Sequence, residues 1–598
     1  MAQERGHWIG RALNIALVAG ALGLAAWVGW TLYSRTYVFS DLAGPAEATS
    51  VAPAVAAQVA DFDRGSPHRM AVLVTDPESD WLGLLRGFRA LGVPVRFTRD
   101  PAAALQHRVV LVYPIVSGKV LSGPELRALA GHVHAGGTLL AFDLAGGGLG
   151  ELFGVDGYAP SQSRELLTWA RAGGVPEEDT IRVNRESKLW TLGYAAAGAQ
   201  VLASFDDGST AVACRESAGM ACVMGLDLGR LAQLGMDGRA EPINRHFVNA
   251  YEPTLDVLLR WVRDLYVARE PVPWLLSTVP GDREVSLLVT HDVDYGGSVA
   301  NTLEYAQALA ERGATGTFFI QTKYRRDFND EVFFDDTVVP VLEGLKQAGM
   351  EVASHSVSHS VVFKAFPMGS GDERYPDYRP TVQSRGEADG ATVLGELRVS
   401  RFLLETLAGT DIPSFRPGHL SYPFALPEAL QATGFRYSSS LTANGALTHL
   451  PYQLTHSRAG RALVPVHEFP VTIEDELPPP LGQRFEQAQA VIEKIARHQG
   501  LVVFLNHPNV TGDKLDFEKR LVEAWKTRAW IGRLDAFGAW WQARDALEVD
   551  IRQQDGAWTL TASGPQPIED LVVHLPKSRV GKLTLTVTPG EPFRHALP

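Results

Sequence analysis

Short apolar runs alternate with amphipathic stretches over the first third of the chain. Four runs are typical of buried strands: Met70–Val74, Val95–Phe97, Val109–Tyr113 and Thr138–Phe142. Two segments with helical spacing, Trp81–Leu91 and Pro124–Ala135, lie between these runs. Strands that alternate with helices favour a parallel sheet covered on both faces. The pattern predicts a doubly wound α/β domain over residues 68–268.

The alternation resumes over residues 282–546, where several apolar runs end in polar side chains. The runs are Val285–Thr290, Gly349–Ser354 and Leu501–Leu505, and the side chains that follow them are Asp292, Asp294, His355, His359 and His507. The carboxyl ends of buried parallel strands deliver side chains to a common cleft. We therefore expect these groups to lie together at one end of a sheet.

The two earlier motifs have the spacing of a metal site. Alternation along an extended chain places Asp292 and Asp294 on one side, and residues four apart on a helical turn, such as His355 and His359, share a face. One carboxylate and two imidazoles can hold a divalent metal while the second carboxylate acts as a base. An Asp-x-Asp turn or cap and a solvated histidine pair are the structural alternatives.

From about Val285 to Ala546 the chain resembles the polysaccharide deacetylase family (NodB homology, carbohydrate esterase type). The resemblance rests on five segments in the family's order: Thr290–Asp294, Ala314–Phe319, His355–His359, Phe415–His419 and Leu505–His507. It implies a distorted (β/α) barrel and a metal-dependent hydrolase that removes N-acetyl groups from a polysaccharide. Zn²⁺ is the default metal for such ligands, although cobalt, nickel or iron also fit N/O sites.

The resemblance also implies roles for single residues. Asp294, His355 and His359 would bind the metal, and Asp292 would be the catalytic base. Arg416 would hold Asp292 by a charge-assisted hydrogen bond.

Two further residues are assigned to the leaving group and the oxyanion. His507 would protonate the departing amine, and a backbone N–H near His419 would stabilise the tetrahedral oxyanion. Without the family context, His507 reads as a core histidine and Arg416 as a surface ion pair.

The chain departs from the family pattern at two places. The fourth family motif carries an Asp that tunes the acid histidine, but Ser438, Ser439 and Ser440 stand there instead. Glu468 is our candidate for its replacement. His419 stands where the family often has Tyr, which changes the rim of the site.

The N-terminal region predicts a membrane anchor within residues 1–40. Leu13–Leu32 is almost wholly apolar, and at about 1.5 Å per residue it can cross a hydrocarbon core of about 30 Å. Arg5 and Arg11 precede it, which favours a cytoplasmic N-terminus and a single-pass protein whose catalytic domain faces the periplasm or exterior. A cleaved signal peptide is the alternative.

Two segments flank the predicted domains. Residues 41–67 are rich in Ala and Pro, which is typical of a linker. Residues 547–598 show short alternating runs separated by Gly and Pro, which predict a small β-sandwich.

The first domain resembles the glutamine-amidotransferase-like fold through Glu125–Leu126 and Gly136–Leu140. No cysteine stands where that fold has its nucleophile, so we predict a non-catalytic domain that binds glycans or other partners. The chain's two cysteines, Cys214 and Cys222, flank a predicted turn and are able to form a disulfide across a hairpin.

Composition narrows the function classes. A chain of 598 residues exceeds one core, and its net charge of -13 disfavours nucleic acid as a partner. The prediction is a membrane-anchored deacetylase acting on exopolysaccharide or, as second choice, peptidoglycan. A catalytically silent glycan-binding protein and an O-acetyl esterase are the alternatives.

Overall fold

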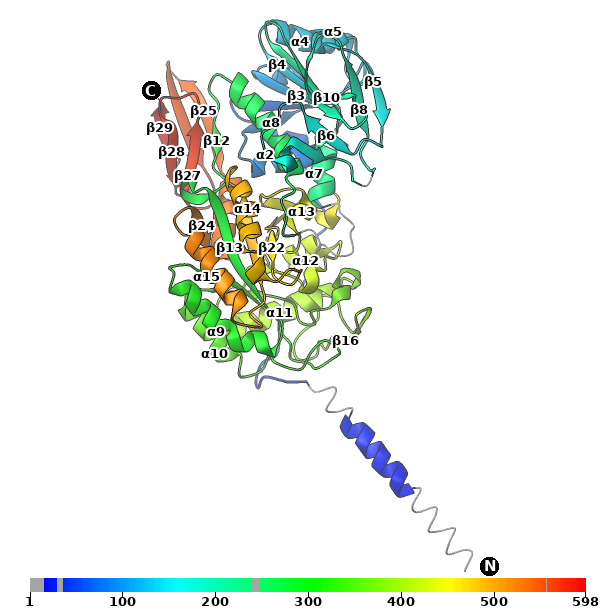
Figure 1. Ribbon diagram of the computed structural model, residues 1–598, viewed down its shortest axis with the longest axis vertical. Coiled ribbons are helices and arrows are strands. Elements are labelled where there is room, and N and C mark those ends of the chain that lie inside the picture. Colours follow the sequence, from blue (N-terminus) through cyan, green and yellow to red (C-terminus); the bar gives the residue numbers. More distant parts are fainter. Residues whose placement is uncertain (1–15, 30–35, 186, 238–247, 555, 598) are drawn as a thin grey trace, which may run out of the picture.

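The computed structural model describes residues 16–29, 36–185, 187–237, 248–554 and 556–597. An α/β unit occupies one end, a second α/β unit the middle, and two small sheets pack beside the junction of both (Figure 1). Along the chain, the first α/β unit precedes the second, and the two small sheets contain the C-terminal residues.

The first unit is built on a mixed sheet of eleven strands. Its main path runs β2-β1-β3-β4-β11-β10-β9-β6-β7, with β5 and β8 off that path. The strands are β1 (Met70–Val74), β2 (Val95–Thr98), β3 (Val109–Val116), β4 (Thr138–Leu144), β5 (Val155–Ser161), β6 (Leu166–Trp169), β7 (Thr180–Arg182), β8 (Thr191–Ala196), β9 (Gln200–Phe205), β10 (Thr210–Glu216) and β11 (Met220–Met224).

The predicted parallel sheet is correct for only part of this unit. Strands β1 to β4 and β11 pair in parallel, whereas β11 to β7 along the path pair antiparallel. The difference has a local cause, because β9, β10 and β11 are joined by turns too short for a crossover helix. The resulting fold is a parallel half extended by antiparallel hairpins.

Seven helices of the described residues belong to this unit. They are α2 (Trp81–Ala90), α3 (Pro101–Ala104), α4 (Gly123–His134), α5 (Gly150–Phe153), α6 (Pro176–Asp179), α7 (Leu228–Met236) and α8 (Thr254–Arg269). Helix α4 begins with a capping box in which Ser122 and Glu125 bond each other's backbone N–H.

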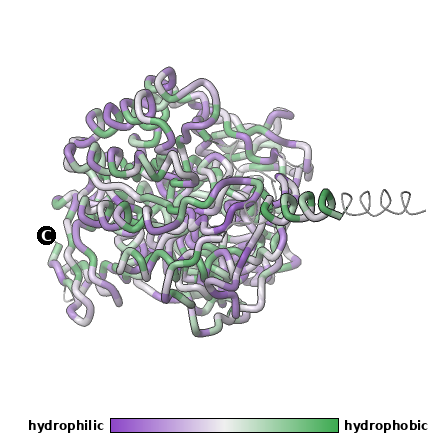
Figure 2. The backbone as a smooth tube through the Cα atoms, turned by 90° about the horizontal axis from the view of Figure 1, so that it is seen from below, coloured by the Kyte–Doolittle hydropathy of each residue, from purple (hydrophilic) through white to green (hydrophobic). Residues whose placement is uncertain are grey.

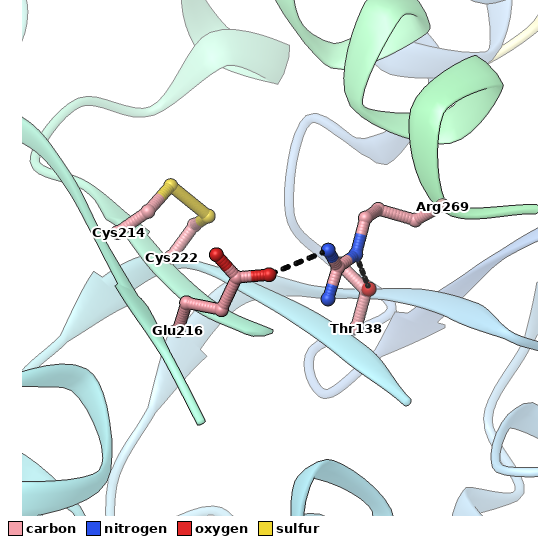
Figure 3. The surroundings of a disulfide bond; sticks show 5 residues. All are labelled: Thr138, Cys214, Glu216, Cys222 and Arg269. Carbon is pink, nitrogen blue, oxygen red and sulfur yellow. Dashed lines mark hydrogen bonds and ion pairs between the residues drawn. A yellow bond between two sulfur atoms is a disulfide. The ribbon is translucent and has the colours of Figure 1, made fainter. Parts of the chain in front are cut away.

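Cys214 and Cys222 form a disulfide across the β10–β11 hairpin (Figure 3). They are direct partners in the antiparallel register, as predicted from the turn between them. Arg269, at the end of α8, donates hydrogen bonds to Glu216 and Thr138 beside this hairpin. The disulfide uses both cysteines of the chain.

The second unit is a curled, incompletely closed sheet in the order β20-β21-β19-β18-β15-β14-β13-β23-β22, with β24 also on β13. Every pair but β20–β21 is parallel. The strands are β13 (Val285–Val293), β14 (Thr317–Ile320), β15 (Glu351–Ser354), β18 (Ser414–Phe415), β19 (Tyr437–Ser438), β20 (Tyr452–Thr455), β21 (Leu463–Glu468), β22 (Ile473–Glu474), β23 (Leu501–Asn506) and β24 (Ala529–Gly532).

Helices cover this sheet, and a separate hairpin projects from it. Because both faces are covered, all residues of β13 and β23 are buried. The helices are α9 (Gly296–Ala310), α10 (Val339–Gln347), α11 (Val393–Ala408), α12 (Leu426–Ala432), α13 (Ala443–Ala446), α14 (Phe485–Ala496), α15 (Asp513–Trp525) and α16 (Leu534–Asp545), and the hairpin is β16 (Thr381–Ser384) with β17 (Glu387–Asp389).

The C-terminal region forms two three-stranded sheets around one apolar core. The first pairs β25 (Glu548–Gln554), β26 (Ala557–Ser563) and β29 (Phe593–Leu597). The second pairs β27 (Ile568–Leu575) and β28 (Gly581–Val587) with β12 (Leu275–Leu276), a strand from the connection between the larger units. The small β domain therefore includes residues from outside the predicted range 547–598.

The predicted membrane span, Leu13–Leu32, lies partly outside the described residues. Residues 16–29 are helical and expose apolar side chains, including Leu17 at 64 % and Trp27 at 62 %. This helix projects from the folded chain and is largely hydrophobic in Figure 2. Among the residues described, no helix combines the length and apolar character needed to cross a membrane.

The Ala/Pro-rich segment runs along the surface of the second unit before it enters the first. The backbone N–H of Tyr37 bonds to Tyr324, Gly44 pairs with Tyr375, and Ala57 bonds to Arg461. These backbone contacts hold the segment in place, which its composition did not indicate.

Candidate active site

Strand ends of the second unit gather the predicted site residues in one place. Asp292 lies near the end of β13, and Asp294 follows that strand. His355 follows β15, and His507 follows β23. Because β13, β14, β15 and β23 are parallel neighbours, their carboxyl ends share one edge of the sheet.

Arg416 holds Asp292 in an orientation suited to a base. Its Nη1 donates to Asp292 Oδ1 at 2.7 Å, and the same nitrogen donates to Thr290 Oγ1. The guanidinium is fully buried and also bonds the backbone and hydroxyl of Ser439. Burial opposes ionisation of Asp292, but Arg416, with smaller contributions from His355 and His507, keeps the pKa of this carboxyl below its usual value. Asp292 is therefore ionised, with Oδ2 turned away from the guanidinium.

The histidine pair converges, although not on a helical turn as we expected. Residues 355–360 are irregular, and both Ser356 (φ 66°) and His359 (φ 52°) adopt left-handed backbone conformations. This tight turn brings the two imidazole centroids to 4.9 Å. The prediction of a shared face was right in outcome and wrong in its geometry, because left-handed residues also reverse a chain within four positions.

The nitrogen chemistry of these histidines fits a metal ligand. His355 Nδ1 donates to the carbonyl of Arg416 at 2.9 Å, which leaves the lone pair on Nε2. That Nε2 is buried and has no hydrogen-bond partner among the described residues. Burial lowers the pKa of both His355 and His359, so both rings are neutral, as metal binding requires.

Asp294 completes the proposed ligand set. Its Oδ2 lies 3.8 Å from His359 Nε2, close to the separation of about 3.4 Å between two ligands of one tetrahedral ion. Across the described residues, no three His, Cys, Asp or Glu side chains already have the spacing of a formed metal site. The residues fit a metal in donor type and protonation, and the ligand assignment remains a proposal.

His507 also lies close to Asp294 and is paired with a residue that the sequence did not reveal. Its Nδ1 lies 2.7 Å from Asp475 Oδ1, and its Nε2 lies 3.7 Å from Asp294 Oδ2. Burial alone would lower the pKa of His507, but Asp475, together with Asp294 and Asp292, more than offsets this and raises it to about 9. His507 is therefore an imidazolium at neutral pH.

Asp475 supplies the carboxylate that seemed missing from the fourth motif. It directly follows β22, the neighbour of β23, and is fully buried. Lys514 also donates to it, and with His507 it lowers the pKa of Asp475 despite burial. A carboxylate that follows an apolar strand could have identified Asp475 from the sequence. Strand β22, however, has only two residues, which is too short to show a strand pattern.

Glu468 does not take this position, so our candidate for the replacement was wrong. Its Oε1 accepts from the backbone N–H groups of Ser440 and Leu441 at 2.6 and 2.8 Å. Burial raises its pKa to about 7. Glu468 thus supports the backbone behind Arg416 and does not line the catalytic pocket.

His419 lies at the mouth of the site. A pocket of about 40 Å³ is lined by Asp292, Asp294, His359, His419, Leu420, Glu474, Glu476, Leu505 and His507. The rings of His359 and His419 are 4.5 Å apart. His419 has a positive φ of 57°, which turns its backbone sharply after Pro417 and Gly418. This position agrees with the expectation that His419 lies at the rim of the site.

The family model for polysaccharide deacetylases matches residues 281–438. No curated protein matches the chain. The solved structures that it resembles include a proposed polysaccharide deacetylase from Mycobacterium smegmatis, with 16 % identity over 44 % of this chain and 93 % of that one, at a TM-score of 0.33.

Two further solved structures belong to carbohydrate esterase family 4. An esterase from Streptomyces lividans in complex with acetate has 15 % identity over 42 % of this chain and 93 % of that one, with a TM-score of 0.25. A pseudoenzyme from Bacillus anthracis has 14 % identity over 43 % of this chain and 66 % of that one, with a TM-score of 0.25. TM-scores this low carry no structural argument, so these likenesses add nothing to the match of the family model.

Proposed function

We propose that residues 282–546 form a metal-dependent hydrolase that removes N-acetyl groups from a polysaccharide outside the cytoplasm. Exopolysaccharide is the first candidate substrate and peptidoglycan the second. The observation that carries the proposal is one pocket lined by an ionised Asp292, a neutral His359 and a protonated His507, with the neutral His355 lying 3.7 Å from Asp292. These are the protonation states that hydrolysis of an amide needs.

Asp292 is the proposed base. Oδ1 is occupied by Arg416, so Oδ2 is the atom that takes a proton from water. The buried ion pair fixes the carboxylate and keeps it ionised at neutral pH.

His507 is the proposed acid. Asp475 occupies Nδ1, which leaves the Nε2 proton available to the departing amine. Asp292 and His507 line the same pocket, and proton removal and proton delivery are assigned to separate side chains.

Asp294, His355 and His359 would hold a divalent cation, most simply Zn²⁺. Such an ion supplies Lewis acidity that makes water more acidic and stabilises negative charge on the acetyl oxygen.

The pair of His507 and Asp475 also bears on the alternatives. A silent glycan-binding protein drew its support from the missing carboxylate, which Asp475 provides. An O-acetyl esterase depends less on an acid because an alcohol leaves more easily than an amine. A histidine with a pKa raised to about 9 therefore favours the N-acetyl substrate.

Acetate release from N- and O-acetylated glycans by the purified protein tests the proposal, with bound metal measured in parallel. We expect Asp294→Ala to lose both metal and acetate release. Asp292→Asn should keep the metal and lose turnover. Full metal content in the Asp294→Ala variant refutes the ligand assignment, and glycan binding without acetate release by the unaltered protein supports the silent alternative.

We further propose that residues 13–32 anchor the protein in a membrane, with the remaining domains outside. The apolar side chains exposed on residues 16–29 support this proposal. The full chain should stay with membranes after alkaline carbonate extraction, whereas a variant that begins at residue 36 should be released. Release of the full chain contradicts the anchor.

A further inference from the structure

A wide cleft of about 720 Å³ opens beside the catalytic pocket. The two share Asp294, His359 and His419. Phe328 and Arg385 also line the cleft, and neither lines the catalytic pocket. Its volume lies in the upper part of the range for ligand sites, about 300–1,000 Å³, which leaves room for more than the reacting sugar.

The wall that carries Phe328 and Arg385 is a hydrogen-bonded unit. The N–H of Phe328 bonds to the carbonyl of Val382 in β16 at 3.0 Å, and the N–H of Val382 bonds to Asp327 Oδ2 at 3.1 Å. Asp327 is buried and paired with Lys323 at 2.6 Å. The loop before Phe328 and the β16–β17 hairpin therefore hold each other in position.

The same wall is tied directly to the catalytic pocket. Asn329 donates from Nδ2 to the carbonyl of His359 at 2.9 Å and to that of Ser358 at 3.2 Å. A group bound at Phe328 is thus at a fixed distance from a proposed metal ligand. This arrangement suits a polymer whose neighbouring units are bound together.

Phe328 and Arg385 are exposed without an evident structural need. Phe328 is 53 % exposed, and Arg385 forms no hydrogen bond or ion pair with any residue that the structure describes. An exposed aromatic ring in a groove offers a flat apolar surface to a ligand. A guanidinium without a partner offers paired donors that match a carboxylate.

The charges around Arg385 restrict where an anionic group can sit. The cleft's acidic side chains are Asp294 and Asp330, and Arg385 is the only Lys or Arg lining it among the described residues. A carboxylate on a glycan bound in this cleft therefore meets its one lysine or arginine at the hairpin.

We propose that Phe328 and Arg385 form a subsite for the sugar next to the one that is deacetylated, and that Arg385 pairs with a carboxylate on that sugar. The preferred substrate is then an N-acetylated glycan that also carries carboxylates. This inference rests on the proposed function and narrows its substrate class.

The test compares one glycan with and without its carboxylates. The probes are oligosaccharides that alternate N-acetylglucosamine with glucuronic acid, and the same oligosaccharides after reduction of their carboxyl groups to alcohols. For the unaltered protein we expect kcat/KM for acetate release to be about tenfold higher on the carboxylated form, mainly through KM, as one charge-assisted contact supplies.

Variants test whether Arg385 and Phe328 cause the preference for the carboxylated form. In Arg385→Gln the ratio of the two kcat/KM values should fall to about one, whereas in the matched control Arg127→Gln, on exposed α4, it should stay as in the unaltered protein. Phe328→Ala should raise KM for both forms. Thermal melting of each variant verifies the fold.

The outcomes separate the two proposals. Acetate release that is equal on both forms, or a preference that survives in Arg385→Gln, overturns the subsite. Higher efficiency on neutral N-acetylglucosamine oligomers also overturns it. Absence of acetate release from every glycan overturns the proposed function itself.

Discussion

Each of the two α/β units places an aspartate near the end of a parallel strand, yet the surroundings shift the pKa of the two carboxyls in opposite directions. In the first unit, Asp227 accepts from the Tyr113 hydroxyl and caps helix α7, and burial raises its pKa to about 6. In the second, Asp292 is more deeply buried, yet Arg416, with help from His355 and His507, lowers its pKa. A guanidinium, and not burial alone, makes a strand-end carboxylate a usable base.

Loss of the base should have the largest effect on activity. Asp292→Asn removes the proton acceptor but retains the hydrogen bond to Arg416, so we expect kcat to fall by about 10²–10⁴-fold. Single-turnover acetate release measures this. The matched change Asp227→Asn in the first unit should leave kcat within about twofold, because no reacting group lies there. Equal losses in both variants would remove the contrast between the units.

Removing the guanidinium should make Asp292 behave more like Asp227. In Arg416→Gln the pKa of Asp292 rises, because the largest contribution opposing burial is lost. Asp292 acts in its ionised form, so activity is lost as pH falls, and the acid limb of the kcat/KM profile should move to higher pH. We expect a decrease of about 10²-fold at neutral pH. An unshifted acid limb in a folded variant contradicts the role of Arg416.

The alkaline limb of the kcat/KM profile depends on the protonation of His507. Asp475→Asn removes the largest of the carboxylate contributions that together raise the pKa of His507 to about 9. His507 acts in its protonated form, so activity is lost as pH rises, and the alkaline limb should move to lower pH. A loss of about tenfold at pH 8 is expected. Lys514→Gln is a milder comparison, because it leaves the hydrogen bond between Asp475 and His507 intact.

The smallest effect concerns stability in the first unit. The folded pKa of Asp227 is raised, so its ionisation costs stability above about pH 6 and not below about pH 4, where it is protonated in both states. Asp227→Asn keeps the cap and removes that cost. We expect its free energy of unfolding to exceed that of the unaltered protein by about 1 kcal/mol at pH 8, with little difference at pH 4. Denaturant unfolding at both pH values checks this.

The sequence predicted those parts of the site that follow long strands. Asp292, Asp294 and His507 come after continuous apolar runs in β13 and β23, whose length makes their ends recognisable. Asp475 was missed because β22 is a two-residue strand whose burial depends on β23, which lies farther along the chain. The geometry of His355 and His359 depends on left-handed residues that spacing does not encode.

The fold was likewise predictable only where the strands and helices have clear local patterns. The parallel core of the first unit was predictable from alternating strands and helices, but its antiparallel extension depends on hairpins with mixed patterns. Strand β12, two residues long, joins a sheet formed some 300 positions later, as the pairing of Leu275 with His574 shows. Long-range pairing of this kind depends on tertiary packing, which local periodicity does not specify.

The most direct measurement is the position of a bound ion. A crystal of the protein grown with Zn²⁺ and examined by anomalous scattering should show one peak about 2.0–2.2 Å from Asp294 Oδ2, His355 Nε2 and His359 Nε2, with Asp292 outside the ligand set. A peak that ignores these three side chains, or one that takes Asp292 in place of Asp294, would contradict the account.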